Sequence, residues 1–355
     1  MRILITGNMG YIGPVVADHF RERFPGCELV GFDTGYFAGC LIDPLRFPEV
    51  TLHEQHFGDI RNFPVRLLSG VDCIVHLAGI SNEPAGEAFA EATRVINRDA
   101  TAKLAAAAKA AGVRHFVFAS SCSVYGACVG DAPRSEADAA NPLTAYASSK
   151  LHAEQELAAL ASDEFPITCL RFGTACGISQ RLRLDLVLND LAASAVLRGE
   201  VRVLSNGTPW RPVIHVKDMA LAIDWASTRS AENGGAFLIV NAGSDEWNYQ
   251  VRDLAETVCA IVPEAELCIA ATAAPEKRSY RVAFSRFRAL APDHQPRQEL
   301  GSTIKELVAG VQTLRSSRAE FPLSHFVRLE VLAELRRRGE LTETLEWRRS
   351  DAASN

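Results

Sequence analysis

A tyrosine and a lysine four positions apart are the residues whose types and spacing most directly suggest chemistry. Tyr146 and Lys150 lie near the start of residues 145–160, whose pattern is typical of a helix. Residues i and i+4 share one helix face, so the ammonium group would lie beside the phenol. A neighbouring positive charge lowers the pKa of a tyrosine from about 10 toward neutral pH. The pair predicts a tyrosine that accepts a proton from a hydroxyl group, although a solvent-facing pair has the same spacing.

Three spaced glycines offer a site for a phosphate group. Gly7, Gly10 and Gly13 follow the first apolar run and open a helical pattern. Such glycines allow a tight turn, a close backbone approach and close helix packing, and the helix N-terminus attracts a pyrophosphate. Asp33 follows Gly13 by 20 positions, at the end of the second apolar run. A carboxylate there accepts from the hydroxyls of a ribose and repels a 2′-phosphate, which predicts NAD as the cofactor.

Alternating apolar and helical segments must position these residues. Apolar runs of strand length occupy residues 3–6, 28–32, 73–77, 116–119 and 167–172, and helical patterns occupy residues 93–111 and 145–160. Continuous apolar strands that alternate with helices indicate a parallel sheet covered on both faces. We therefore expect an α/β fold, a Rossmann-type doubly wound parallel sheet with a smaller C-terminal substrate-binding domain.

After residue 173, apolar strands and helical segments no longer alternate regularly. We place the expected domain boundary there. Residues 181–199 look helical, and residues 201–204 and 212–216 look like strands. We expect a NAD-binding Rossmann domain over residues 1–173, to which the chain returns at about 213–243. A mainly substrate-binding domain would cover residues 174–317, followed by a charged helical C-terminal extension over residues 318–355.

The composition and net charge of the chain argue against several classes of binding partner. The chain of 355 residues is 48% hydrophobic and carries a net charge of −6, which is typical of a globular protein and argues against nucleic-acid binding. No apolar run approaches the roughly 20 residues that span a membrane, and the N-terminus lacks the pattern of a signal peptide. The nine cysteines are scattered without a C-x-x-C pair. We therefore expect no metal site, no membrane partner and a cytoplasmic location.

Several further motifs occur in a recognisable order. They lie at residues 6–13, 59–60, 76–79, 120–126, 146–150 and 211–218. From residue 1 to about 243 the chain resembles the extended short-chain dehydrogenase/reductase family, of the NAD-dependent nucleotide-sugar epimerase/dehydratase type. The resemblance implies NAD as cofactor, a nucleoside-diphosphate sugar as substrate and a homodimer.

The resemblance assigns catalytic and cofactor roles by position. Ser121 would hydrogen-bond the reacting sugar oxygen, Tyr146 would be the acid and base, and Lys150 would also bond the nicotinamide ribose. The expected cofactor-binding residues are Gly7, Met9, Gly10, Tyr11, Ile12, Gly13, Asp33, Asp59, Ile60, Leu77, Ala78, Gly79, Tyr146 and Lys150.

On the substrate side, Arg211 would grip the diphosphate, because a guanidinium fork makes two charge-assisted hydrogen bonds. Arg278 resembles a second diphosphate arginine. A surface arginine paired with a carboxylate is the alternative for Arg211, and a solvent-facing side chain is the alternative for Asn189. The expected substrate-binding set is Ser121, Ser123, Tyr146, Thr174, Asn189, Arg211 and Arg278.

Departures from the family pattern narrow the reaction. Cys122 and Ser123 stand where dehydratases of the family carry an aspartate and a glutamate, which argues against a 4,6-dehydratase. We therefore expect an epimerase that acts through a transient keto intermediate, most often at C4 of the sugar. The alternatives are a ketoreductase or dehydrogenase of a nucleotide sugar and a non-catalytic NAD-binding sensor or scaffold. A sensor would have no need of the pair Tyr146 and Lys150.

Overall fold

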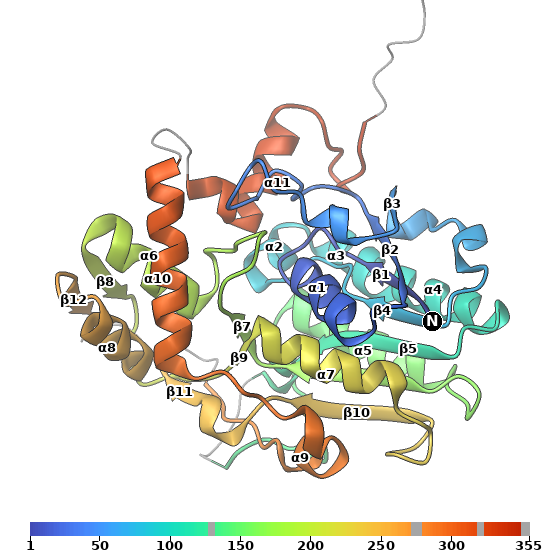
Figure 1. Ribbon diagram of the computed structural model, residues 1–355. Helices are drawn as coiled ribbons and strands as arrows, with labels where there is room; N and C mark the ends of the chain where they lie inside the picture. The colour runs from blue at the N-terminus through green and yellow to red at the C-terminus, as the bar shows by residue number, and fades with distance from the viewer. Residues whose placement is uncertain (127–131, 271–278, 318–322, 349–355) are drawn as a thin grey trace, which may run out of the picture.

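A seven-stranded, entirely parallel sheet forms the centre of the computed structural model, which describes residues 1–126, 132–270, 279–317 and 323–348. The strand order is β10-β6-β5-β4-β1-β2-β3 (Figure 1). The strands are β1 (Arg2–Thr6), β2 (Glu28–Asp33), β3 (Glu54–Phe57), β4 (Cys73–His76), β5 (His115–Ser121), β6 (Ile167–Phe172) and β10 (Phe237–Ala242). The predicted Rossmann-type sheet is confirmed.

Helices cover both faces of this sheet. Helices α1 (Gly13–Arg23) and α7 (Val216–Thr228) pack on one face, where Ile3 and Ile5 join their apolar side chains. The other face, which Leu4 enters, is covered mainly by α2 (Glu83–Ala88), α3 (Ala90–Arg94), α4 (Ala100–Ala110) and α5 (Ala145–Ala158). Because neighbouring strand residues point to opposite faces, both sets of side chains are buried, which explains the continuous apolar runs.

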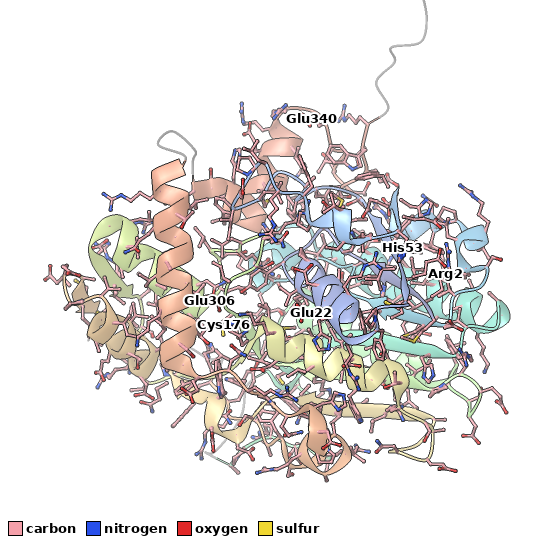
Figure 2. All side chains as sticks on the ribbon, viewed as in Figure 1. Arg2, Glu22, His53, Cys176, Glu306 and Glu340 are labelled. Atoms are coloured by element: carbon pink, nitrogen blue, oxygen red, sulfur yellow. The ribbon has the colours of Figure 1, made fainter. Side chains whose placement is uncertain are left out.

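The edge strand β3 has no apolar run and was not predicted. Its sequence Glu-Gln-His-Phe is only partly buried, since one side of the strand has no neighbour in the sheet. Arg2 bridges the edge through ion pairs with Glu28 of β2 and Glu54 of β3. Figure 2 labels Arg2 and His53 at this edge.

A smaller group of elements extends from the carboxyl end of the sheet. One short sheet has the order β11-β9-β7, and β12 pairs with β8. These strands are β7 (Thr174–Cys176), β8 (Glu200–Val203), β9 (Trp210–His215), β11 (Asn248–Gln250) and β12 (Glu266–Ile269), with helices α6 (Val187–Arg198), α8 (Val251–Ile261) and α10 (Leu300–Ser317). Helix α9 (Ser285–Leu290) packs instead against β10 of the main sheet, where Phe287 joins the core on the α1 and α7 side. The chain thus rejoins the main sheet through β10, whereas the strand expected at residues 212–216 pairs with β7 and β11 instead.

The helix expected over residues 181–199 begins only at Val187. The preceding residues form a loop, because their charged side chains turn inward. Arg181 is fully buried and pairs with Glu49, and Arg183 pairs with Asp185. A helix over the same residues would place these side chains according to its 3.6-residue period, not according to their partners.

Helix α10 is tied to the rest of the protein by an ionic contact. His215 Nε2 lies 3.3 Å from Glu306 Oε2, and Lys217 Nζ lies 2.7 Å from Glu306 Oε1. Figure 2 labels Glu306 on this helix. His215 is fully buried and its Nδ1 accepts a hydrogen bond from the Lys217 backbone. It therefore acts as the core and capping residue that its apolar surroundings indicate.

The last described segment contains α11 (Arg328–Arg337) and ends at residue 348. Leu341 and Leu345 of this segment are buried in the core on the α4 and α5 side of the main sheet. The segment therefore packs on the body of the protein. Within the described ranges, no helix combines the length and apolar character needed to cross a bilayer.

Candidate active site

A cavity of about 990 Å³ lies where the main strands end. Its wall includes the residues at or just after the ends of β1, β2, β4, β5 and β6, namely Gly7, Asp33, Leu77, Ser121 and Gly173. Ligands of open α/β sheets bind outside the carboxyl ends of the strands. The smaller group of elements closes the opposite side, with Thr174 and Arg211 on the wall.

The glycine turn has the shape that a diphosphate site needs. Gly7 has φ +75°, and a Cβ atom there would lie 2.5 Å from the backbone nitrogen of Ala78. A Cβ atom on Gly13 would lie 2.1 Å from the carbonyl oxygen of Asn8, so α1 packs directly on the turn. No side chain caps the N-terminus of α1, which leaves its N–H groups available to an anion.

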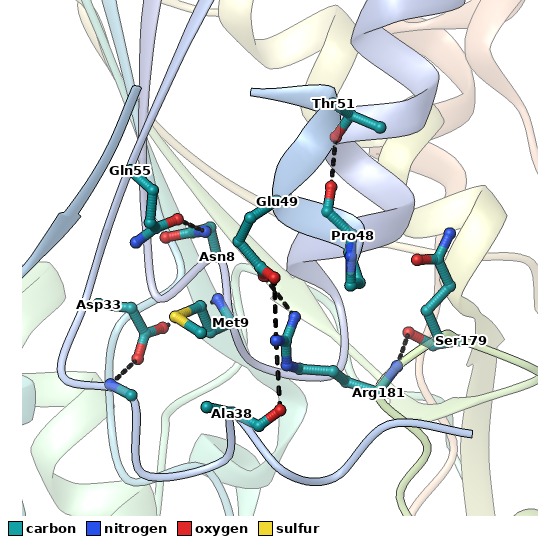
Figure 3. A network of polar contacts seen from close by, with 12 residues as sticks. Asn8, Met9, Asp33, Ala38, Pro48, Glu49, Thr51, Gln55, Ser179 and Arg181 are labelled. Carbon is teal, nitrogen blue, oxygen red and sulfur yellow. Dashed lines mark hydrogen bonds and ion pairs between the residues drawn. The ribbon is translucent and has the colours of Figure 1, made fainter. Parts of the chain in front are cut away.

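Asp33 is held in place at the end of β2. Its Oδ2 accepts a hydrogen bond from the Met9 backbone at 3.0 Å, and its Oδ1 accepts one from Gly35 at 2.7 Å (Figure 3). Burial raises the pKa of Asp33, and these two backbone donors oppose that shift. Asp59 caps the next turn by accepting from the Arg61 backbone, and both carboxylates reach the cavity wall.

Most of the residues predicted for the cofactor lie together on this wall. They are Gly7, Gly10, Tyr11, Ile12, Asp33, Asp59, Ile60, Leu77, Ala78, Gly79, Tyr146 and Lys150. Met9 and Gly13 do not reach the cavity. Met9 instead orients Asp33 through its backbone N–H, and Gly13 allows the close packing of α1.

Asn97 connects the end of β4, on the cavity wall, to helix α5, which carries Tyr146 and Lys150. It lies in a π-helical turn, Val95–Asp99, and is fully buried. Its side chain bonds both backbone groups of Ile80 and donates to Ser149 Oγ at 3.0 Å. A Cβ atom on Gly79 would lie 2.9 Å from Asn97 Oδ1, so glycine is required at this close approach. These contacts fix α5 against the end of β4.

The three predicted catalytic residues meet in the cavity. Thr144 caps α5 by accepting from the Ala147 backbone at 3.2 Å, which places Tyr146 in the first turn. Ser121, at the end of β5, lies on the same cavity wall as Tyr146, and its Oγ accepts a hydrogen bond from the Ser123 backbone at 3.1 Å. Lys150 Nζ donates to the Ala119 carbonyl at 2.8 Å and lies 6.0 Å from the centre of the Tyr146 ring.

Burial governs the protonation of this pair. It raises the pKa of Tyr146, against the opposing effects of the Ser121 hydrogen bond and the positive charge of Arg183. Burial also lowers the pKa of Lys150 to about 8, while the charge of Glu154 opposes that shift. The expected lowering of the Tyr146 pKa by Lys150 is absent here. The ammonium group points at a carbonyl oxygen, so desolvation of the phenol dominates.

A buried polar network joins helix α5 to strands β5 and β6, and it was not predicted from the sequence. Glu154 of α5 accepts from Arg171 at 2.9 Å and 2.6 Å and from Ser120 at 2.6 Å. Arg171 also donates to the Tyr125 hydroxyl at 3.1 Å. Arg171 is a charged residue within an otherwise apolar strand. Charged side chains are almost never fully buried without a partner, so this residue was the signal in the sequence that a buried acidic partner exists.

The predicted substrate residues divide into two groups. Ser123, Thr174 and Arg211 lie on the cavity wall, and the buried Ser123 hydroxyl has no hydrogen-bond partner among the described residues. Asn189 is not on the wall. It is fully buried, accepts from the Gly177 backbone and donates to Tyr11 and Arg183, so its amide has structural partners. Arg278 lies outside the described residues.

Two arginines on the wall were missed by the sequence analysis. Arg183 Nε donates to Asp185 at 2.7 Å, and Arg183 Nη1 donates to Ser81 at 2.9 Å. Its positive charge acts on the pKa of Tyr146, so it lies close to the predicted reacting groups. Arg328 of α11 also reaches the cavity. In the sequence, Arg181 and Arg183 alternate with leucines that are buried in the structure. This pattern could have indicated that the two arginine side chains also point inward.

Comparisons with known proteins agree with this geometry. The sequence profile of the NAD dependent epimerase/dehydratase family matches residues 3–243. A UDP-glucose 4-epimerase of Streptomyces lividans is 28% identical over 279 residues, which cover 72% of this chain and 80% of that protein.

Solved structures of nucleotide-sugar enzymes are also similar to this chain. The structure of MoeE5 in complex with UDP-glucuronic acid and NAD has a TM-score of 0.73 and 26% identity, over 89% of this chain and 100% of that one. A UDP-glucose-4-epimerase from Stenotrophomonas maltophila, with a TM-score of 0.75 and 22% identity over 90% of this chain and 99% of that one, shares the fold. The chain therefore belongs to the NAD dependent epimerase/dehydratase family and is an NAD-dependent enzyme of the extended short-chain dehydrogenase/reductase type.

Proposed function

We propose that the protein is an epimerase of a UDP-hexose that inverts C4 through a transient keto intermediate. The observation that carries the proposal is that Ser121, Tyr146 and Lys150 lie on the wall of the same cavity as the glycine turn. One cavity thus offers a proton-transferring phenol and a turn suited to a dinucleotide. The UDP-glucose 4-epimerase relative supports the choice of C4, and the structure of MoeE5 in complex with UDP-glucose and NAD supports the choice of UDP as the nucleotide.

The residues present fit NAD. The uncapped N-terminus of α1 and the turn at Gly10 suit a diphosphate, and the buried carboxylate of Asp33 suits the hydroxyls of a ribose. Lys150 on the same wall suits the second ribose. Bound there, NAD supplies the oxidising power by accepting a hydride from the sugar carbon and giving it back.

The protein's own residues perform the proton transfer. Tyr146 accepts the proton of the sugar hydroxyl as the keto intermediate forms and returns it when the hydroxyl re-forms. Ser121 hydrogen-bonds the same sugar oxygen and orients it toward the phenol. Tyr146 accepts this proton as the tyrosinate, a form that burial disfavours by raising the pKa of the phenol and that the Ser121 hydroxyl and the charge of Arg183 favour.

The rest of the wall suits the nucleotide sugar. Arg211 would bind the diphosphate of the substrate, with Arg278 as a second arginine. The unpartnered Ser123 hydroxyl and Thr174 would bond the hexose. Hydrogen-bonding groups without a partner in the free protein favour a polar ligand that satisfies them.

The test is turnover of UDP-glucose without net redox change, followed by NMR, together with mass spectrometry of the nucleotide that co-purifies. Tyr146→Phe removes the proton-transferring hydroxyl, so we expect activity to fall by about 10² to 10⁴ while NAD remains bound. Tyr249→Phe, outside the cavity, is the control and should leave activity unchanged. Full activity of Tyr146→Phe would remove this residue from the mechanism.

Other results would identify the alternatives. Stoichiometric consumption of the cofactor would indicate a ketoreductase or dehydrogenase. Tight NAD binding without activity on UDP-, GDP-, CDP- or dTDP-sugars would indicate a sensor or scaffold.

The family resemblance also supports a homodimer, and the scattered cysteines support a cytoplasmic location. Light scattering of the purified protein tests the first of these proposals, and fractionation of the source cells tests the second.

A further inference from the structure

The C-terminal segment, residues 323–348, lies beyond the region that the family profile matches and packs beside the cavity. Trp347 Nε1 donates to the Thr34 carbonyl at 2.8 Å, and the Tyr36 hydroxyl donates to the Leu345 carbonyl. Both partners belong to the loop that follows β2 and Asp33. Figure 1 shows α11 beside this blue N-terminal part of the chain. The segment is thus docked at the end of the cavity where Asp33 lies.

Through Arg328, the first residue of α11, the C-terminal segment contributes to the cavity wall. The Arg328 side chain is 3% exposed. The guanidinium lies 4.6 Å from the centre of the Phe37 ring, and Nη2 donates to the Arg181 carbonyl at 3.2 Å. Nη1 has no hydrogen-bond partner among the described residues. One buried cationic donor of this wall residue therefore has no hydrogen-bond partner among the described residues.

The neighbouring charges do not neutralise Arg328. Arg181 is paired with Glu49, and Arg183 is paired with Asp185 through two hydrogen bonds. The three guanidinium groups thus share two carboxylates, and Arg328 makes no ion pair among the described residues. Burial lowers the pKa of Arg328, and the positive charges of Arg183 and Arg181 lower it further, whereas Cys40 and the carboxylate of Asp185 oppose these shifts. A buried cation without an ion-pair partner of its own is costly, so this site favours an anionic ligand.

The position of Arg328 indicates which anion this is. Arg181 lies close enough to Asp33 to lower its pKa, and Arg183 lies close enough to Tyr146 to lower its pKa. Arg328 donates to the Arg181 carbonyl and lies on the same cavity wall as Asp33 and Tyr146. A dinucleotide that spans Asp33 and Tyr146 carries its diphosphate between these two residues, within the same cavity.

We propose that Arg328 donates a hydrogen bond to the diphosphate of bound NAD, and that residues 323–348 therefore form part of the cofactor site and slow its release. The inference rests on the proposed function, because it takes NAD as the ligand of this cavity. The diphosphate of the nucleotide sugar offers the same chemistry, and the experiment must separate the two.

The test compares three forms of the full-length holoenzyme: wild type, Arg328→Gln and Arg337→Gln. Arg337 is on the same helix but is exposed and paired with Glu334, so its variant matches the change of charge. NAD release is followed by mass spectrometry under an excess of ADP-ribose, and UDP binding is measured by calorimetry. We expect Arg328→Gln to release NAD 10- to 100-fold faster and to bind UDP within about twofold of wild type, as befits the loss of one hydrogen bond to a charged group. Arg337→Gln should match wild type in both.

Other outcomes would overturn the proposal. Unchanged NAD release with a lower Tm would make Arg328 a structural residue, and weakened UDP binding alone would assign it to the nucleotide sugar. If Arg328→Gln does not fold, Arg328→Lys keeps the charge without the planar fork and should release NAD at an intermediate rate; a wild-type rate would refute the proposal. A wild-type protein that neither retains nor binds NAD would instead refute the proposed function.

Discussion

We expect Glu154→Gln to destabilise the protein and to move the alkaline limit of its activity to lower pH. Glu154 is 1% exposed and accepts three hydrogen bonds, two from Arg171 and one from Ser120. A glutamine has one acceptor oxygen, and its amide nitrogen would face the donors of Arg171. The variant therefore leaves a buried guanidinium without its counter-charge.

The size of the effect follows from this burial. Removing one partner of a buried ion pair costs about 3–5 kcal/mol. With an unfolding entropy of about 2.1 cal/mol/K per residue, a chain of 355 residues loses about 4–7 °C in Tm. Glu154 also raises the pKa of Lys150, which burial lowers to about 8. Without this carboxylate the pKa of Lys150 falls further, so the ammonium group loses its proton at lower pH.

Calorimetry and a pH profile of kcat measure the two effects. Glu156→Gln is the matched control, because Glu156 lies on the same helix and pairs with Arg98 at the surface. Such exposed pairs contribute about 0–1 kcal/mol, so its Tm should change by about 1 °C at most. The reasoning fails if Glu154→Gln loses no more stability than this control, or if the alkaline limit of kcat stays where it was.

Two further predictions concern pH and backbone conformation. The hydrogen bond from His215 and the charge of Lys217 lower the pKa of Glu306 from 4.5 to about 2, so its stabilisation is complete above pH 4.5 and is lost as pH falls toward 2. Glu306→Gln should lower stability by about 1 kcal/mol at neutral pH, and a Tm difference that stays constant down to pH 2 would contradict this. Gly7→Ala should abolish NAD binding and cost far more than Gly112→Ala, because both glycines have positive φ but only at Gly7 would the Cβ atom meet backbone, at 2.5 Å. Gly112→Ala should cost about 1–2 kcal/mol in thermal unfolding, and equal losses in the two variants would refute the close approach.

The main sheet was predictable because its strands are buried on both faces. Strands β1, β2, β4, β5 and β6 all appear in the sequence as apolar runs, and the polar edge strand β3 does not. The predicted cofactor residues follow these strands, so their meeting at one end of the sheet was also predictable. Edge strands lack this signal, since only part of their surface is covered.

The charged groups around the cavity were not predictable. Arg183 and Arg328 are 145 positions apart, yet both reach one cavity. The sequence indicates neither that residues 323–348 dock on the loop after β2 nor that residues 178–186 form a loop. Asn189 shows the converse, because a polar residue on a predicted helix was assigned to substrate, whereas its amide bonds Tyr11 and Arg183. Which polar side chains face the cavity depends on packing between distant elements.

By itself, the sequence determined the parallel sheet, the glycine turn and the placement of Tyr146 and Lys150 on one helix, because these depend on local spacing and on burial along single strands and helices. Only the tertiary structure decided how burial shifts the pKa values of that pair, which carboxylate pairs with Arg171, and that Arg183 and Arg328 are the buried arginines on the cavity wall. Desolvation and charge pairing depend on which groups from distant segments are enclosed together, and no local pattern records that enclosure.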